Sequence, residues 1–393
     1  MNQVNPFEYH KSINNMEVYN DFYQTNQRGT LTEIHVADLH FGAMDPSVQY
    51  NILKEQLLYK AANVDFQIFA INGDIFHHKF MSNSDVVLYA NLFIDDVVRL
   101  CRSKNATLLI LHGTMSHDAN QLKLFYHYIG TVDIRIVEHI QFEMVQGAKV
   151  LCIPEEYNMG YDYYAPYLFN SGYYDMACIH GAVKGSIFGC NEMNLDSIKA
   201  PVFDISCFIN CRGPVICGHV HIAGCFQKHI YYCGSPYRWQ FGEEQSKGFL
   251  TVLHNLDSQQ YCVEMNEITS FRYDTINLDN MATSDPKKVI QYLIDLKQSG
   301  IDFIKVRFTQ DCQNISILKN YYKNDPNIVI DAADVTFNET IKKNQSNNEK
   351  YKEFDYILDP NLSEFEIMTR YINHFKGENY ITTDELIKIL SDI

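Results

Sequence analysis

The feature that most constrains this chain is a pattern that recurs five times, in which an apolar, strand-like run ends and histidine or aspartate follows it. The five runs are residues 31–37, 66–71, 108–111, 176–179 and 215–217. The polar residues behind them are, in order, Asp38 and His40, Asp74 and His77, His112 with His117 and Asp118, His180, and His219 with His221. A single such residue is more often a core side chain or a turn former. Five in the same relation to five runs indicate one shared site.

Helical patterns separate the first three runs. Pro46 suits the first turn of a helix, and apolar residues then recur at helical spacing as far as Ala61. Ser84 and Asp85 predict the start of a second helix. Alternating strands and helices are typical of a parallel sheet, in which ligands bind at the carboxyl ends of the strands. The sequence therefore predicts an α/β fold with these polar residues gathered along one edge.

The residue types at this edge indicate a metal site. Imidazole and carboxylate ligands without thiolates favour Mn²⁺, Fe, Zn²⁺ or Co²⁺ over Ca²⁺. The set is too large for one tetrahedral ion, and Asp74, central among the five segments, suits a bridge between two ions. Two ions can generate hydroxide at neutral pH and stabilise an in-line displacement at phosphorus, and a protonated histidine can act as general acid. The predicted chemistry is phosphoester hydrolysis.

The order of these motifs resembles that of the calcineurin-like metallophosphoesterases. The matching segments are Asp38-x-His40, Gly73-Asp74, His117-Asp118, His180 and Gly218-His219-x-His221. Residues 73–77 resemble the recombination-nuclease branch that includes bacterial and phage SbcD, and residues 232–236 and 247–249 are similar to its Gly-Ser-Pro segment and Lys-Gly strand. The resemblance covers about residues 31–270. It implies a sandwich of two β-sheets flanked by helices.

The resemblance also implies a role for each matching residue. One metal ion would be held by Asp38, His40, Asp74 and His221, and the other by Asp74, His180 and His219. His117 corresponds to the catalytic histidine, with Asp118 beside it to orient the ring. His77 corresponds to a histidine that assists at the scissile phosphate. The implied cofactors are two divalent ions, and Mn²⁺ is the expected metal.

The third motif departs from the family pattern. The family reads Gly-Asn-His-Asp, whereas residues 113–118 contain inserted residues and place Ser116 where the asparagine ligand stands. Serine is a poorer neutral oxygen ligand, so we expect Ser116 to bind the second metal weakly or through water. An alternative alignment makes His112 the motif histidine, but only His117 is followed directly by an aspartate.

The remaining segments predict further domains. Residues 1–30 form an N-terminal extension and residues 31–270 the nuclease domain, and residues 271–338 read as a β-α-β-α-β unit that the resemblance implies is a capping domain. Residues 339–354 form a polar linker. Residues 355–393 contain two short amphipathic helices with capping boxes at Ser363 and Thr382. By resemblance this tail binds an SbcC-type ABC ATPase, although it can also pack on its own chain.

Bulk composition limits the partners of the chain. The formal net charge is −16, whereas most DNA-binding proteins carry a basic surface. Metal ions and a partner protein would have to supply positive charge, so we expect weak, salt-sensitive DNA binding by the isolated chain. Apolar runs are too short to span a membrane, and Cys178, Cys217 and Cys233 lie in strand-like runs as reduced thiols. We expect a soluble, cytoplasmic protein.

These observations favour a Mn²⁺-dependent DNA nuclease that acts with an ATPase in DNA repair, recombination or replication. Its expected activities are those of an exonuclease on double strands and an endonuclease on single strands, and the family commonly forms homodimers. A phosphatase or phosphodiesterase with another substrate is an alternative. A catalytically impaired scaffold, suggested by the altered third motif, is another.

Overall fold

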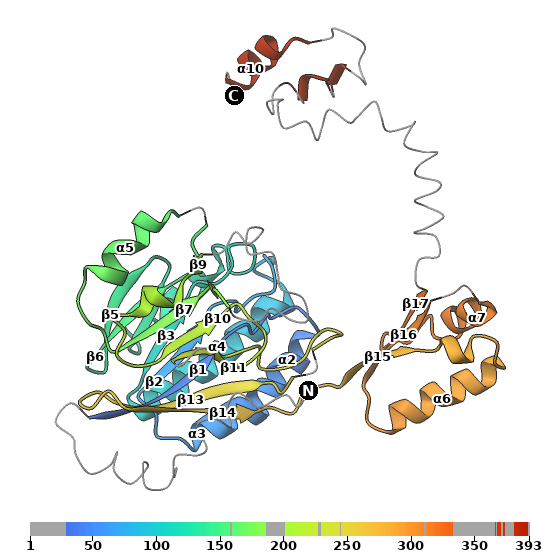
Figure 1. Ribbon diagram of the computed structural model, residues 1–393, viewed down its shortest axis with the longest axis horizontal. Coiled ribbons are helices and arrows are strands. Elements are labelled where there is room, and N and C mark those ends of the chain that lie inside the picture. Colours follow the sequence, from blue (N-terminus) through green and yellow to red (C-terminus); the bar gives the residue numbers. More distant parts are fainter. Residues whose placement is uncertain are drawn as a thin grey trace. The chain divides into compact units, whose positions relative to one another are not determined.

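The structure is a computed structural model, and it describes residues 29–157, 159–185, 201–226, 229–243, 245–309, 312–332, 366, 368–370, 372–373 and 381–391. The chain divides into two compact units (Figure 1). The first comprises Met1–Asp274 and Gly300–Phe303, and the second comprises Thr275–Ser299 and Ile304–Ile393. Residues 1–28 of the predicted extension and the whole predicted linker, residues 339–354, lie outside the described residues.

The first unit contains two six-stranded sheets of mixed direction. The first sheet has the order β14-β13-β1-β2-β3-β4. Its strands are β1 (Thr30–Val36), β2 (Ile68–Asn72), β3 (Thr107–Leu111), β4 (Ile134–Val137), β13 (Gly248–Asn255) and β14 (Tyr261–Glu267). Strands β1 to β4 are parallel, and the hairpin of β13 and β14 joins antiparallel to β1.

The second sheet has the order β11-β12-β10-β7-β6-β5. Its strands are β5 (Gln141–Val145), β6 (Ala148–Ile153), β7 (Met176–His180), β10 (Val215–Gly218), β11 (Gly224–Phe226) and β12 (Ile230–Tyr232). The four strands β6, β7, β10 and β12 run parallel, and β5 and β11 are antiparallel edges. Strands β8 (Ala182–Val183) and β9 (Val202–Phe203) form a separate pair.

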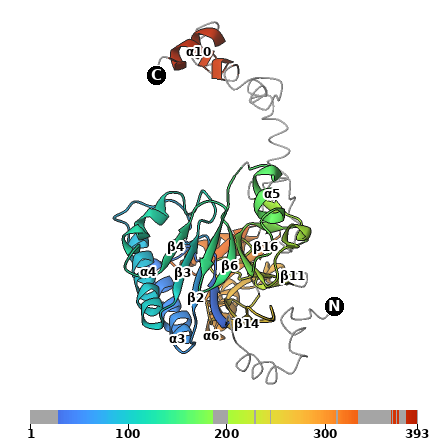
Figure 2. The same ribbon diagram turned by 90° about the vertical axis from the view of Figure 1, so that its left-hand side faces the viewer.

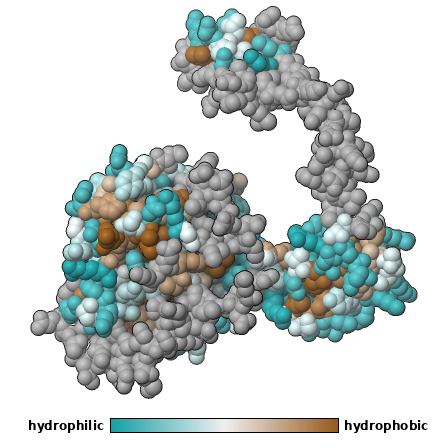
Figure 3. Space-filling model, viewed as in Figure 1, coloured by the Kyte–Doolittle hydropathy of each residue, from teal (hydrophilic) through white to brown (hydrophobic). Residues whose placement is uncertain are grey.

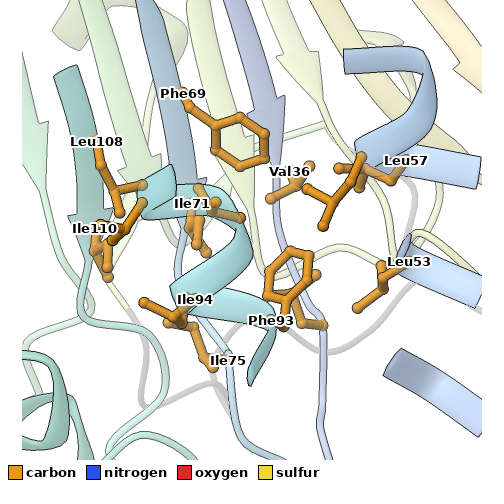
Figure 4. Close-up of a cluster of buried hydrophobic side chains, with 14 of the residues drawn as sticks. Val36, Leu53, Leu57, Phe69, Ile71, Ile75, Phe93, Ile94, Leu108 and Ile110 are labelled. Carbon is orange, nitrogen blue, oxygen red and sulfur yellow. The ribbon is translucent and has the colours of Figure 1, made fainter. Parts of the chain in front are cut away.

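Side-chain alternation along the strands builds the layers. Val36 and Ile71 face the helices, whereas Ile68 and Leu109 join Cys178 in a cluster that connects the two sheets. Helix α4 (Asp85–Lys104) packs on the outer face of the first sheet through residues such as Phe93 (Figure 4). Figure 2 shows α3 and α4 on one side of β2 to β4, with β6 on the other. The predicted α/β class, with two sheets flanked by helices, is observed.

The helices between the first strands begin where the sequence predicts. Pro46 opens α2 (Pro46–Ile52), which continues through the π-helical stretch η2 (Leu53–Leu58) into α3 (Tyr59–Ala62). The Ser84 side chain accepts the backbone N–H of Val87 and caps α4. A short 3-10 helix, η3 (Gln121–Tyr128), follows β3. Helices α5 (Tyr161–Phe169) and η5 (Ile205–Phe208) contribute to the apolar cluster of the second sheet.

The second unit has the predicted β-α-β-α-β order. It contains β15 (Tyr273–Asn277), η6 (Asp279–Met281), α6 (Pro286–Gln298), β16 (Phe303–Phe308), α7 (Gln313–Tyr321) and β17 (Ile328–Ala332). The sheet order is β15-β16-β17, with β16 and β17 parallel. The tail helix α10 (Thr383–Ser391) starts at the predicted capping box, because the Thr382 and Glu385 side chains bond each other's backbone amides. Ser363, the other predicted cap, lies outside the described residues.

The remaining features of the described residues are the state of the cysteines, the length of the helices and the polarity of the surface. Cys178, Cys217 and Cys233 are free and buried in or beside strands, as expected. None of the helices in the described segments is both long and apolar enough for a membrane crossing. Hydrophilic residues interrupt the apolar ones over the coloured surface of each unit (Figure 3).

Candidate metal centre

Six parallel strands, three from each sheet, end at the edge where the polar residues gather. These strands are β1, β2 and β3 of the first sheet and β6, β7 and β10 of the second. The loop after β1 runs beside the loop after β2, because the amides of Asp38 and His40 donate to the carbonyls of Gly73 and Asp74. Strand pairing thus continues past the strand ends and brings distant side chains together, as the sequence predicts.

The backbone at this edge is strained. Asp38, His40, Asp74 and His219 have φ values of 54°, 46°, 56° and 82°, in the left-handed region that non-glycine residues seldom occupy. Such conformations cost about 1–3 kcal/mol each and persist where surrounding contacts enforce them. Four strained residues in one place indicate a functional constraint on the direction of their side chains.

Glycines permit the close approach of the strand ends. A Cβ atom on Gly73 would lie 2.2 Å from Nδ1 of His180, and one on Gly113 would lie 2.2 Å from the backbone nitrogen of Asp74. A Cβ on Gly218 would lie 2.2 Å from the carbonyl oxygen of Asn72. Any larger residue at these positions would push the candidate ligands apart.

One group of candidate ligands consists of Asp38, His40 and His221, whose ligand atoms all lie within 4.8 Å of one another. The Nε2 atoms of His40 and His221 are 3.0 Å apart, and His221 Nε2 is 3.9 Å from a carboxylate oxygen of Asp38. Burial, together with the neighbouring imidazoles of His221 and His117, lowers the pKa of His40 well below its ordinary value. His40 is therefore neutral, which is the state that binds a metal.

Asp74 lies at the centre of the site. One of its carboxylate oxygens is 3.4 Å from His180 Nε2, 3.7 Å from His40 Nε2 and 4.0 Å from His117 Nδ1. Burial raises the pKa of Asp74, but the charge of the His180 imidazole outweighs burial and holds that pKa well below its ordinary value. Asp74 also belongs to a group with Asp38 and His180 that could hold an ion. It is thus placed to connect two sites.

A second group consists of Glu155, His180 and His219, again with all ligand atoms within 4.8 Å. Glu155 Oε2 is 3.1 Å from His219 Nδ1 and 3.5 Å from His180 Nε2. His180 Nδ1 donates to the carbonyl of Asn72 at 2.6 Å, which directs Nε2 toward the two carboxylates. Burial alone would lower the pKa of His180, but Asp74, Asp38 and Glu155 raise it well above its ordinary value.

Sequence reasoning did not identify Glu155. Residues 150–153 are apolar and Pro154-Glu155 follows, so the signal is the same strand-then-acid pattern that revealed the other ligands. Two features set this segment apart from the other motifs: the acidic residue is a glutamate, and a proline separates it from the apolar run.

The third motif brings His117, rather than His112, to the site, as expected. His117 lies among the candidate ligands, in a group with His40 and His77, and its Nδ1 is 3.1 Å from His40 Nδ1. His112 instead directs both ring nitrogens at the backbone carbonyls of Gly113 and Ala119. The geometry therefore favours His117 over His112 as the motif histidine.

The expected role of Asp118 needs correction. We expected its carboxylate to orient the His117 ring, but it accepts hydrogen bonds from the backbone amides of Asp74, Ile75, Phe76 and Gly113. Among the described residues it makes no hydrogen bond to His117. Asp118 is fully buried and holds the loop after β2, so it positions Asp74 rather than His117.

Ser116 and Thr114 differ in their access to the site. Ser116 is exposed, and its role as a metal ligand stays a prediction. Thr114 lies between the carboxylates, because its hydroxyl is 3.1 Å from Asp74 Oδ2 and 3.1 Å from Glu155 Oε2. Its backbone amide also donates to Asp74 at 2.6 Å.

The Gly-Ser-Pro and Lys-Gly segments support His221. The buried ammonium of Lys247 donates to the backbone carbonyl of His221 at 2.9 Å, to the Ser235 hydroxyl at 2.8 Å and to Glu243 at 3.0 Å. Glu243 also lies 3.7 Å from His221 Nδ1. Lys247 therefore fixes the backbone of a candidate ligand.

His77 and Trp239 border the first group of ligands. The His77 ring centroid is 5.5 Å from that of His40 and 5.7 Å from that of His117. The indole of Trp239 is 5.1 Å from the His77 ring and 5.5 Å from the His221 ring. The only tryptophan of the chain is thus a spectroscopic probe of this site.

The donor set fits a divalent metal. Asp38, Asp74 and Glu155 are almost completely buried, and every ion-pair partner that they have in the described part of the chain is a histidine. Nε2 of His180 is buried and makes no hydrogen bond with the described residues. Buried carboxylates beside imidazoles are stabilised when a cation binds between them. These clusters can therefore hold metal ions.

Comparison with known proteins shows a distant homologue. The protein named "Putative phosphoesterase 244L" of Invertebrate iridescent virus 6 is 23% identical to this chain over 235 residues. The similarity covers 56% of this chain and 76% of the viral protein. No protein-family model matches the chain.

Proposed function

We propose that this chain is a metal-dependent phosphoesterase of the calcineurin-like class and that it hydrolyses phosphodiester bonds in DNA. The observation that carries the proposal is the convergence of Asp74 with His180 and His221 from three strand ends in two sheets. The name of the viral homologue agrees with this chemistry. The motif resemblance to the SbcD branch is what favours DNA over other phosphoesters.

Each residue has a role in this proposal. Asp38, His40 and His221 would hold one ion, His180 and His219 the other, and Asp74 would bridge them. When bound, the ions supply positive charge at the phosphate and lower the pKa of a water molecule, which makes hydroxide available at neutral pH. We infer Mn²⁺ as the metal from the motif resemblance, because the nitrogen and oxygen donors alone suit Fe, Zn²⁺ and Co²⁺ equally well.

His117 is placed to act as the general acid. Its Nδ1 is fixed by His40, its side chain is 24% exposed, and its Nε2 makes no hydrogen bond with the described residues. A proton on Nε2 can therefore reach the leaving oxygen of a bound phosphodiester. His77, one ring away from both His40 and His117, would contact the phosphate.

The substrate test compares phosphodiesters with a phosphomonoester. With Mn²⁺ present, we expect the full chain to hydrolyse bis-p-nitrophenyl phosphate faster than p-nitrophenyl phosphate, and to degrade linear duplex DNA and circular single-stranded DNA. Asp74→Asn should lower each rate by at least about 100-fold, since one bridging ligand serves both ions. Asp65→Asn is the matched control, because Asp65 is exposed and precedes the same strand that Asp74 follows.

The outcomes separate the candidate functions. Hydrolysis of the monoester alone would favour a phosphatase and defeat the DNA proposal. The absence of DNA hydrolysis, with or without an ATPase partner, would also defeat the DNA proposal. A chain that hydrolyses neither ester and binds no metal would be the scaffold alternative.

We propose that the partner is an SbcC-type ATPase and that it docks on the tail. In the described part of the tail, Met368 and Ile387 are 43% and 42% exposed, and Asn373 exchanges two hydrogen bonds with the backbone of Ile381. Short amphipathic helices with exposed apolar residues suit docking in a partner's groove. Deleting residues 355–393 should abolish association with the ATPase and leave hydrolysis of bis-p-nitrophenyl phosphate unchanged. Retained association would contradict this.

A homodimer is also proposed from the resemblance alone. Sedimentation of the full chain tests it, and a monomer at all concentrations would contradict it.

A further inference from the structure

We propose that Glu155 is a ligand of the second metal ion, together with His180 and His219. This inference rests on the proposed dinuclear centre and deepens it, because neither the motifs nor the homologue assigns a role to this residue. It also identifies a buried oxygen donor, whereas Ser116, the donor expected from the third motif, is exposed.

Distance and direction support the assignment. Glu155 Oε2 is 3.1 Å from His219 Nδ1 and 3.5 Å from His180 Nε2, and all three ligand atoms lie within 4.8 Å of one another. A single ion at normal nitrogen and oxygen bond lengths of about 2.0–2.2 Å can contact atoms spaced in this way. Nε2 of His180 makes no hydrogen bond in the described residues and faces this group.

The backbone holds Glu155 in place. It follows β6 at the same sheet edge at which His180 ends β7, and these strands are parallel neighbours. The amide of Glu155 donates to the carbonyl of His112 at 3.2 Å, which joins the second sheet to the loop after β3. The residue is therefore presented to the site by both sheets, as the other ligands are.

The two buried carboxylates of Glu155 and Asp74 favour a cation between them. Glu155 is 1% exposed, and Asp74, at 3% exposed, is linked to it through the hydroxyl of Thr114. A hydroxyl has one proton, so it can donate to only one of the two carboxylates at a time. Two buried anions with a shared donor are the chemistry of a divalent cation site.

The alternative is that Glu155 only orients His219 through a hydrogen bond. Glutamine separates the two roles, because Glu155→Gln keeps an oxygen that can accept from the ring but removes the charge that binds the ion. Glu156→Gln is the matched control. Glu156 carries the same change one residue away, but its carboxylate faces His139 and Tyr163 instead of the site.

The experiment counts Mn²⁺ ions on the full chain by equilibrium dialysis and elemental analysis, and records the electron paramagnetic resonance spectrum. We expect two ions with a coupled signal in the wild type and in Glu156→Gln. In Glu155→Gln one ion should remain, the affinity for the second should fall at least about tenfold, and the signal should become that of isolated Mn²⁺. Glu155→Asp, which keeps the charge, should bind the second ion better than Glu155→Gln and serves if the glutamine variant does not fold.

Failure of this inference differs from failure of the proposed function. Two coupled ions of unchanged affinity in Glu155→Gln would overturn the assignment and leave the dinuclear enzyme intact. Loss of both ions from a folded Glu155→Gln would also overturn it, since Glu155 would then serve the whole centre. Fewer than two ions on the wild type would defeat the dinuclear function itself, and the inference with it.

Discussion

The Nδ1 atoms of His117 and His40 lie 3.1 Å apart, so one imidazole donates the hydrogen that the other accepts. Because the pKa of buried His40 is lowered, chiefly by desolvation, His40 is the neutral partner. The contact therefore couples a candidate general acid to a candidate metal ligand. It explains how a residue six positions beyond the end of β3 is held in the site.

His117→Ala should lower hydrolysis of bis-p-nitrophenyl phosphate by about 100-fold to 10,000-fold, the usual contribution of general acid catalysis. The number of bound Mn²⁺ ions should stay at that of the wild type. His127→Ala is the matched control, because the exposed His127 side chain contacts the carbonyl of Leu124 and the ring of Tyr128, neither of which is a candidate ligand. If His117→Ala loses an ion, His117 is a ligand and not the acid.

Asp118→Asn should destabilise the fold. The carboxylate accepts four backbone amides, and an asparagine offers one oxygen and an NH₂ group that cannot accept. At least one pair of buried amides then loses its partner, at a cost of about 3 kcal/mol in the free energy of unfolding. Urea unfolding measures this loss, and His117→Ala, which removes one contact with His40 rather than the acceptor of four amides, should change stability less.

The pKa of Asp118 gives a second check on that variant. Burial and the charge of Asp74 raise this pKa to about 6. A raised carboxyl pKa means that the folded state binds the proton more tightly, so this group favours folding less as pH rises from about 4 to 6. In chelator, the stability difference between wild type and Asp118→Asn should therefore change across this interval. A constant difference would show that Asp118 does not titrate there.

Glu33 should contribute the opposite pH dependence. It is completely buried between His35 and His254, and although burial raises its pKa, the two imidazoles outweigh burial and hold that pKa below 4.5. Because the folded pKa is depressed, the stabilisation is present above about pH 4.5 and is lost as pH falls through the folded pKa. Unfolding in urea, with chelator present, should show that the free energy of unfolding of wild type exceeds that of Glu33→Gln at about pH 6 and that this difference shrinks by about pH 3.5.

A matched variant isolates that effect. Glu264 is exposed on β14 of the same sheet, so Glu264→Gln should change the free energy of unfolding by no more than about 0.5 kcal/mol at either pH. An advantage of wild type over Glu33→Gln that is equal at both pH values would contradict the assigned shift.

Metal removal should destabilise the protein and alter its fluorescence. At 100 times the dissociation constant, one bound ion stabilises the folded state by about 2.7 kcal/mol. We expect Mn²⁺ to raise the melting temperature of chelated wild type, but not that of Asp74→Asn. The ring centroid of Trp239 lies 5.4 Å from that of His40 and 5.5 Å from that of His221. The fluorescence emission of Trp239 should therefore change in the same titration. An identical rise in both proteins would place the stabilising ion elsewhere.

Much of the fold followed from local patterns in the sequence. Ser84 caps a helix and Thr382 caps another, because the capping bonds join residues three positions apart. Continuous apolar runs predicted strands β2, β3 and β7, in which every residue is buried. These relationships need no knowledge of the rest of the chain.

The site was predicted only in part. Strand-end positions identified Asp38, Asp74 and His180 because parallel strands deliver their carboxyl ends to one edge. The same pattern did not indicate which of the several oxygen donors faces the centre. Glu155 and Thr114 face it and Ser116 is exposed, which depends on how the loops after β3 and β6 pack.

The sequence by itself determined the elements, their order and the residue types at the strand ends. Only the tertiary structure decided that β13 pairs beside β1, that Asp118 binds the backbone around Asp74, and that Glu155 joins the histidines. The physical reason is the distance along the chain between the residues that interact. Helix caps and apolar runs are fixed within a few residues, whereas these contacts depend on the packing of strands and loops that are far apart in the chain.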